Sequence, residues 1–121
     1  MEQIHRTLGW VAIAAISSVG LWGVVASLMK RALPRAFRPA LWTSVLLFVV
    51  QITLGVYMFS QGNDPGSKHT FYGFIWLFSA AFVYMFKAEL EKNPALRWGL
   101  VLLYMGWLGY RGVQTFGLGL S

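Results

Sequence analysis

Long runs of apolar residues alternate with short charged segments along this 121-residue chain. Three of the runs contain no Asp, Glu, Lys or Arg, and a fourth contains only Arg97 and Arg111. A helix rises about 1.5 Å per residue, so about 20 apolar residues cross the roughly 30 Å hydrocarbon core of a bilayer. The pattern therefore predicts four transmembrane helices, over about residues 5–29, 39–61, 69–87 and 95–116.

Short connections set the topology that we expect for these helices. Pro34 and Pro39 cannot lie in a helix interior and mark the first connection, while residues 62–67 read Gly-Asn-Asp-Pro-Gly-Ser, a turn cluster. Pro94 marks the start of the last helix, because proline is favoured in a first turn. Short connections make neighbouring helices antiparallel. We therefore expect a single all-α domain over residues 1–121, an integral membrane antiparallel four-helix bundle.

Composition agrees with a membrane location. The chain is 57% hydrophobic and 12% charged, whereas about a quarter of the residues in soluble domains are charged. The net charge of +6 lies in short segments between apolar runs, as in membrane proteins, and does not indicate nucleic acid binding. Cysteine is absent, which excludes disulfides and thiolate metal sites. The first partner that we expect is the lipid bilayer.

The positive charges predict an orientation. The first and third connections together carry seven basic residues, namely Lys30, Arg31, Arg35, Arg38, Lys87, Lys92 and Arg97. The opposite side carries only Arg6, Lys68 and Arg111. Because cytoplasmic loops are enriched in Lys and Arg, both termini are predicted to lie outside the cytoplasm. The expected location is the plasma membrane of a bacterium or an archaeon.

The two histidines of the chain suggest a cofactor. His5 begins the first predicted helix and His69 begins the third, so both lie at the same depth near the outer face. The first and third helices of an antiparallel bundle are commonly diagonal, and two facing imidazoles can occupy both axial positions of a haem iron. Gly9 and Gly73 each follow a histidine by four residues, where a flat macrocycle could lie close to the backbone.

A simpler interpretation of the same residues remains open. Small residues recur after His5 at helical spacing, and such stripes are frequent in membrane helices because they allow close helix packing. A histidine at a helix end can also be an interfacial polar residue with no ligand.

Two short motifs around the histidines resemble a known family. Residues 2–6 have the pattern E-x-x-H-R, and residues 51–55 have the pattern Q-x-x-x-G. Together with His69, they resemble one half of the heme A synthase family, a four-helix haem-binding bundle, over roughly residues 2–75. The resemblance implies that both histidines ligate a haem near the outer face. It also implies a catalytic role for Glu2 if the chain modifies haem.

Further polar residues fall where a haem would need them. Arg6, Lys68 and Arg111 lie at the outer helix ends, where they would pair with haem propionates or reach lipid headgroups. Gln51 lies nearer the middle of the second helix and is expected to hydrogen-bond to another helix or to a ligand. The cofactor expected from this set is one haem b.

Three functions fit these expectations. The leading interpretation is a b-type cytochrome-like protein that transfers electrons alone or as a subunit of a redox complex, with membrane protein partners or a second copy of itself. The second is a haem-modifying oxidoreductase, and the third is a cofactor-free accessory subunit of a respiratory or photosynthetic complex. The apolar runs lack intramembrane carboxylates, which argues against an ion pump or a proton-coupled transporter.

Overall fold

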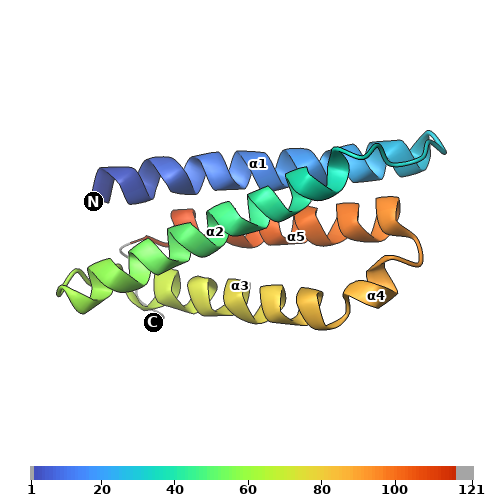
Figure 1. Ribbon diagram of the computed structural model, residues 1–121. Helices are drawn as coiled ribbons and strands as arrows, with labels where there is room; N and C mark the ends of the chain where they lie inside the picture. The colour runs from blue at the N-terminus through green and yellow to red at the C-terminus, as the bar shows by residue number, and fades with distance from the viewer. Residues whose placement is uncertain (1, 117–121) are drawn as a thin grey trace.

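The chain folds into an all-α structure. The computed structural model describes residues 2–116, and within this range five helices and no strands are present (Figure 1). The helices are α1 (Glu2–Leu28), α2 (Phe37–Ser60), α3 (Ser67–Met85), α4 (Lys87–Leu90) and α5 (Pro94–Gln114). The predicted helical class is therefore confirmed, and the four long helices correspond to the four apolar runs.

The helix boundaries differ from the predicted ones by one to three residues at each end of the four long helices. The helix α2 begins at Phe37, two positions before Pro39, because the first N–H groups of a helix have no intrahelical partner and tolerate proline. The third predicted helix ran to residue 87, but α3 ends at Met85 and the short α4 follows Phe86. The last long helix begins at Pro94, as the position of that proline predicts.

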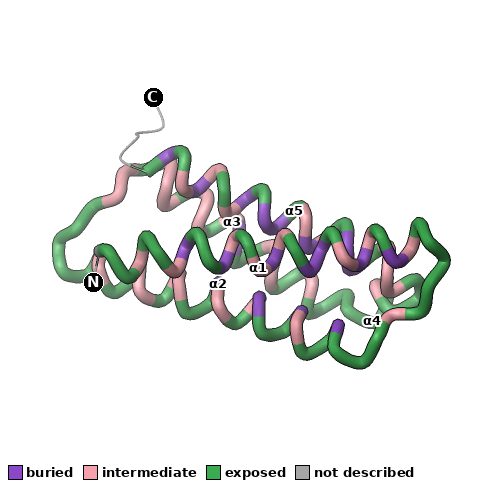
Figure 2. The backbone as a smooth tube through the Cα atoms, turned by 90° about the horizontal axis from the view of Figure 1, so that it is seen from above, coloured by how far each residue is buried: buried purple, intermediate pink, exposed green. Residues whose placement is uncertain are grey.

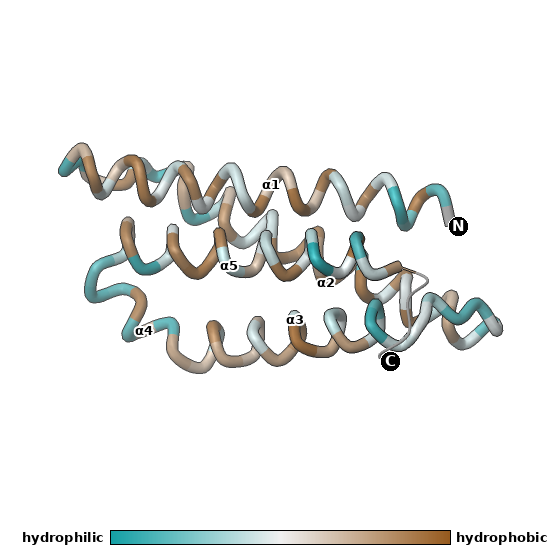
Figure 3. Tube along the Cα trace, turned by 180° about the vertical axis from the view of Figure 1, so that it is seen from behind, coloured by the Kyte–Doolittle hydropathy of each residue, from teal (hydrophilic) through white to brown (hydrophobic). Residues whose placement is uncertain are grey.

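Two of the helices described within residues 2–116 are long and apolar enough to cross a membrane by length and composition. They are α1, over Gln3–Leu28, and α2, over Phe37–Ser60. Hydrophilic segments gather at the helix ends and in the connections, whereas the middle of the bundle is largely apolar (Figure 3). These two helices agree with the predicted membrane class.

The closest contact in the bundle joins α1 to α5. A Cβ atom added to Gly99 would lie 2.7 Å from the backbone nitrogen of Val24 and 2.9 Å from the carbonyl oxygen of Gly20. A Cβ atom at Gly23 would lie 2.7 Å from the carbonyl oxygen of Ala95. Glycine is therefore required for the two backbones to touch. This part of the small-residue stripe after His5 serves helix packing, as the simpler interpretation of the sequence proposed.

The other helices are arranged around this pair. The helix α1 also packs against α2, and α5 also packs against α3, whereas α2 and α3 are not among the most closely packed pairs. The helix α2 crosses the bundle obliquely in Figure 1. Buried positions follow the inner faces of α1 and α5 (Figure 2). The helices α1 and α3 consequently lie diagonally across the bundle, as expected.

A polar cluster ties the connections together at the end of the bundle that holds α4. The Arg38 guanidinium donates a hydrogen bond to the Glu91 carboxylate, which also accepts one from Trp98 Nε1 at 3.0 Å. These contacts join the start of α2 to the connection before α5. The hydrogen bond from Arg38 is the main reason that the pKa of Glu91 lies below its ordinary value.

A first prediction concerns the contact between α1 and α5. We expect Gly99→Ala to destabilise the protein by about 1–3 kcal/mol, because the added methyl group must push two backbones apart. Gly73→Ala is the matched control, since an added Cβ there meets no other described heavy atom within 4 Å. The control should gain about 0.5–1 kcal/mol from helix propensity. Thermal unfolding in detergent measures both changes, and equal stability of the two variants would contradict the prediction.

A second prediction follows from the lowered pKa of Glu91. The bonds to its carboxylate stabilise the folded state fully above the unfolded pKa of about 4.5, and this contribution is lost as the pH falls through the lower, folded value. Because the ion pair is about half exposed, we expect Glu91→Gln to cost at most about 1 kcal/mol at pH 7. The difference from wild type should shrink in unfolding experiments at pH 3, and a constant difference would refute this account.

Candidate functional site

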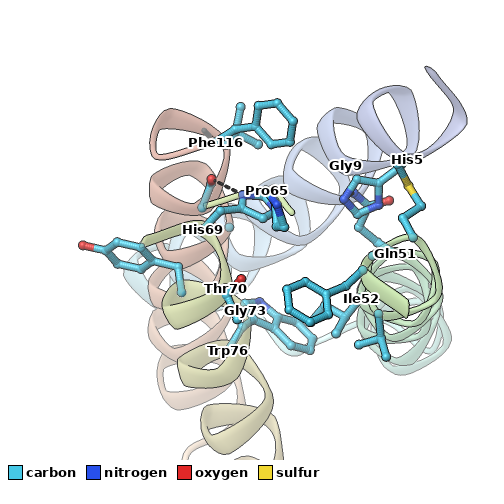
Figure 4. Close-up of a pocket in the computed structure, with 18 of the residues that line it drawn as sticks. His5, Gly9, Gln51, Ile52, Pro65, His69, Thr70, Gly73, Trp76 and Phe116 are labelled. Carbon is cyan, nitrogen blue, oxygen red and sulfur yellow. Dashed lines mark hydrogen bonds between the residues drawn. The ribbon is translucent and has the colours of Figure 1, made fainter. Parts of the chain in front are cut away.

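A cavity of about 620 Å³ lies between α2 and α3, at the end of the bundle where α1 begins. Residues of α1 and α5 complete its walls, and the connection between α2 and α3 contributes residues 62–65. Its volume falls within the range of about 300–1,000 Å³ that is usual for ligand pockets. The lining is mostly apolar, with both histidines and Gln51 among its few polar side chains (Figure 4).

The two histidines approach this cavity from opposite sides. His5 comes from the first turns of α1 and His69 from the first turn of α3 (Figure 4). Their ring centres are 6.2 Å apart, and the ring planes are inclined by 74°. The structure therefore brings together two imidazoles that are 64 positions apart in the sequence, at one end of the bundle as predicted.

His69 is held by the backbone of α5. Its Nδ1 atom lies 2.7 Å from the carbonyl oxygen of Gly112, which can only accept a hydrogen bond. The Nδ1 atom of a neutral ring must therefore carry the proton, and the Nε2 atom carries the lone pair. Histidines that ligate metals usually donate their other N–H to a carbonyl or carboxylate in this way. The Phe116 ring contacts the His69 imidazole edge-on, with 5.4 Å between centres.

His5 is held differently, by a side chain of α2. Its Nε2 atom lies 3.4 Å from the amide nitrogen of Gln51, a long contact for a hydrogen bond. The Nδ1 atom of His5 and the amide oxygen of Gln51 are buried and find no hydrogen-bond partner within residues 2–116. Buried polar atoms without partners are rare in proteins and need an explanation, such as a ligand that the site is built to hold.

Glycines make room for these side chains. A Cβ atom at Gly9 would lie 2.9 Å from the Gln51 amide nitrogen, and one at Gly55 would lie 3.0 Å from His5 Cε1. Gly73 lines the cavity and faces space that no other described heavy atom occupies within 4 Å. Thus Gly9 accommodates Gln51, whereas Gly73 leaves an open surface against which a flat ligand would fit.

A stacked aromatic pair closes the cavity toward the middle of the bundle. Phe48 on α2 and Trp76 on α3 have ring centres 4.5 Å apart and planes inclined by 14°. Trp76 is 1% exposed, and its Nε1 atom donates to the carbonyl oxygen of Met105 at 3.2 Å. This pair spans the gap between α2 and α3 through side chains.

The other predicted site residues are placed unequally. Arg6 lines a second cavity of about 300 Å³, which shares His5, Gln51 and His69 with the first. The Arg111 guanidinium donates to the Gln114 amide oxygen at 2.8 Å and lies over the Tyr72 ring, and neither Arg111 nor Lys68 belongs to the described lining. Glu2 begins α1, but its side chain lies outside the part of the chain that the structure describes.

The number of possible metal-ligating side chains indicates which kind of metal the site could hold. Within residues 2–116, no group of three or more His, Asp or Glu side chains is arranged to hold a metal ion. A zinc or calcium site built from protein side chains alone needs at least that many. Two opposed imidazoles beside an apolar cavity suit instead an iron whose other ligands come from a macrocycle.

Comparison of the chain with protein-family models, with curated proteins and with solved structures finds no significant match. The resemblance to the heme A synthase family accordingly rests on residues 2–6 and 51–55 and on His69, and it stays a prediction.

Two features of the site could not be foreseen from the sequence. The acceptor for His69 is a backbone carbonyl, that of Gly112, and every residue carries such a group. The pairing of Gln51 with His5 depends on how α1 and α2 cross, although the Q-x-x-x-G motif does contain both Gln51 and Gly55, which contact His5.

A third prediction concerns the tautomer of His69. We expect the neutral ring to carry its proton on Nδ1, because the Gly112 carbonyl accepts from that atom. Nitrogen NMR of histidine-labelled protein at pH 8.5 distinguishes the two tautomers, with His69→Gln used to assign the signals. A proton on Nε2 would show that the contact with Gly112 does not form.

Proposed function

We propose that this chain is a small membrane haem b protein in which His5 and His69 ligate one iron near the outer face. The observation that carries the proposal is a ring-centre distance of 6.2 Å across a shared cavity. An imidazole nitrogen lies about 2 Å from a transition metal that it binds, so two imidazoles on opposite sides of one iron have centres about 6 Å apart. The observed separation suits such an iron.

The surroundings of the histidines support the same proposal. The hydrogen bond to Gly112 prepares His69 Nε2 as a ligand. The Nδ1 atom of His5 and the amide oxygen of Gln51 are buried without a hydrogen-bond partner among the described residues, which suits a site that binds a further group. The open surface at Gly73 and the apolar walls suit the face of a porphyrin. Arg6, which lines the adjoining smaller cavity, would pair with a propionate carboxylate, and Lys68 and Arg111 lie on helices that reach the same end of the bundle.

The proposal includes four membrane spans. Beyond α1 and α2, both α3 and α5 carry large apolar side chains on the outside of the bundle, where water would make them costly and lipid would not. On these two helices the exposed set outside the cavity lining comprises Phe71, Phe78, Phe82, Tyr84, Met85, Leu100, Tyr104, Trp107 and Tyr110. With the basic residues of the first and third connections in the cytoplasm, both termini and the cavity lie on the outer side.

The chemistry that fits this arrangement is electron transfer. A haem b held here would supply a one-electron iron couple. Ligation by both histidines would favour electron transfer over chemistry on a bound substrate, because a substrate would first have to displace one of them. Electrons would be exchanged with a partner in the membrane, either another protein or a second copy of this chain.

A haem-modifying activity, with Glu2 as a catalytic group, remains a second proposal carried by the family resemblance. It would change the type of haem that can be extracted from cells expressing the protein, whereas an electron carrier would leave the haem type unchanged.

A fourth prediction tests haem binding. Purified protein mixed with hemin should give the visible spectrum of a six-coordinate haem b, with sharp bands on reduction. His5→Ala and His69→Ala should each weaken hemin binding more than about tenfold, since loss of a ligand costs at least as much as loss of its supporting contact. Absorption titrations measure both effects.

Gly73→Phe provides an independent test of the cavity. Because Gly73 faces open space, the new ring should enter the cavity without unfolding the bundle, yet it should prevent hemin binding. Ser79→Ala is the control, because Ser79 lies on the same helix as Gly73 but does not line the cavity. This variant should bind hemin as wild type does. If folded wild-type protein takes up no hemin, the proposal is wrong, and the interpretation as a cofactor-free accessory subunit remains.

A further inference from the structure

The two histidines of the cavity are held by contacts of different strength. His69 donates to a backbone carbonyl at 2.7 Å through Nδ1, the nitrogen that a ligating histidine does not need. His5 meets the Gln51 amide at 3.4 Å through Nε2. The contact of His69 therefore leaves its Nε2 atom able to bind a metal, whereas the contact of His5 occupies the Nε2 atom of that ring.

The geometry of His5 makes Nε2 the nitrogen that an iron would use. Nδ1 is adjacent to the ring carbon that carries Cβ, so a wide planar macrocycle meets the side chain and backbone if it approaches Nδ1. Nε2 lies on the far side of the ring and is unhindered by the residue's own main chain. The Gln51 amide thus occupies the nitrogen with better access.

Glycines flank the contact between Gln51 and His5. Gly9 on α1 leaves space for the Gln51 amide, and Gly55 on α2 leaves space for the His5 ring. A methyl group at either position would lie within about 3 Å of this pair, and the flexible side chains would have to shift. The contact therefore lies between α1 and α2, in space that these two glycines leave free.

We propose that Gln51 holds His5 in the ligand-free protein and competes with iron for its Nε2 atom, so that His5 is the exchangeable ligand and His69 the fixed one. A neutral diatomic gas would then bind the iron on the side of His5. This inference rests on the proposed function for its iron-bound half, but the contact between Gln51 and His5 is a property of the ligand-free chain.

The competition has an expected size. When His5 Nε2 binds the iron, it gives up the long hydrogen bond from the Gln51 amide, which then loses this partner. A hydrogen bond of this kind changes an equilibrium constant by about two- to tenfold. The affinity of His5 for iron would be lowered by that factor. His69 would keep its contact with Gly112 with and without iron.

The first experiment uses the ligand-free protein. Nitrogen NMR of histidine-labelled protein in detergent compares wild type with Gln51→Leu, which removes both hydrogen-bonding groups and offers no ligand to iron. The ring nitrogen signals of His5 should move, and those of His69 should not. Gln61→Leu is the matched control, since Gln61 caps the same helix, is exposed and does not line the cavity. Unchanged His5 signals in Gln51→Leu would overturn the proposal.

The second experiment uses hemin-loaded, reduced protein and carbon monoxide. Wild type should bind carbon monoxide, and Gln51→Leu should bind it about two- to tenfold more weakly, because His5 then holds the iron without competition. The control Gln61→Leu should stay within about twofold of wild type, since Gln61 does not line the cavity. Equal or tighter binding by Gln51→Leu, or no binding by wild type, would contradict the proposal.

The two experiments separate this inference from the proposed function. If wild type takes up no hemin, the proposed function fails together with the exchange at iron, while the NMR comparison still decides whether Gln51 holds His5. If hemin binds through both histidines and the carbon monoxide affinity is insensitive to Gln51, the proposed function stands and the inference is wrong.

Discussion

The backbone contact between α1 and α5 is the constraint on which the rest of the bundle depends. Gly20 and Gly23 meet Gly99 with no space for another Cβ atom, so these two helices form the tightest pair. The helix α2 packs on one member of this pair and α3 on the other. The outer two helices therefore face each other across a wider space, which side chains bridge at Phe48 and Trp76. The cavity is the part of this space that remains unfilled.

The same pair also determines the spacing of the imidazoles. His5 belongs to α1, and His69, although it belongs to α3, is fixed to the Gly112 carbonyl of α5. Both rings are thus positioned by contacts with the tightest helix pair of the bundle, and His5 is held in addition by Gln51 of α2. A site built on rigid, closely packed helices keeps a precise geometry, because its side chains have little freedom to move.

Much of the fold follows from the pattern of charge and proline, whereas the contacts of the site do not. Uncharged runs predict the four long helices, and Pro94 predicts the start of α5, because these signals are local. The turn at Phe86 that separates α3 from α4 has no such signal. The meeting of His5 and His69 was expected from helix order, but the roles of Gln51 and Gly112 depend on helix crossing and on a backbone carbonyl, which no sequence pattern specifies.

The bundle is fastened at the end opposite to the cavity. The cluster of Arg38, Glu91 and Trp98 joins α2 to the connection before α5, at the end where α4 lies, whereas the cavity lies where α1 begins (Figure 1). The half of α2 that carries Gln51 and Gly55 lies away from this cluster and is held instead by packing against α1. The two ends of α2 are thus fixed by different means, an exposed ion pair at one and close helix packing at the other.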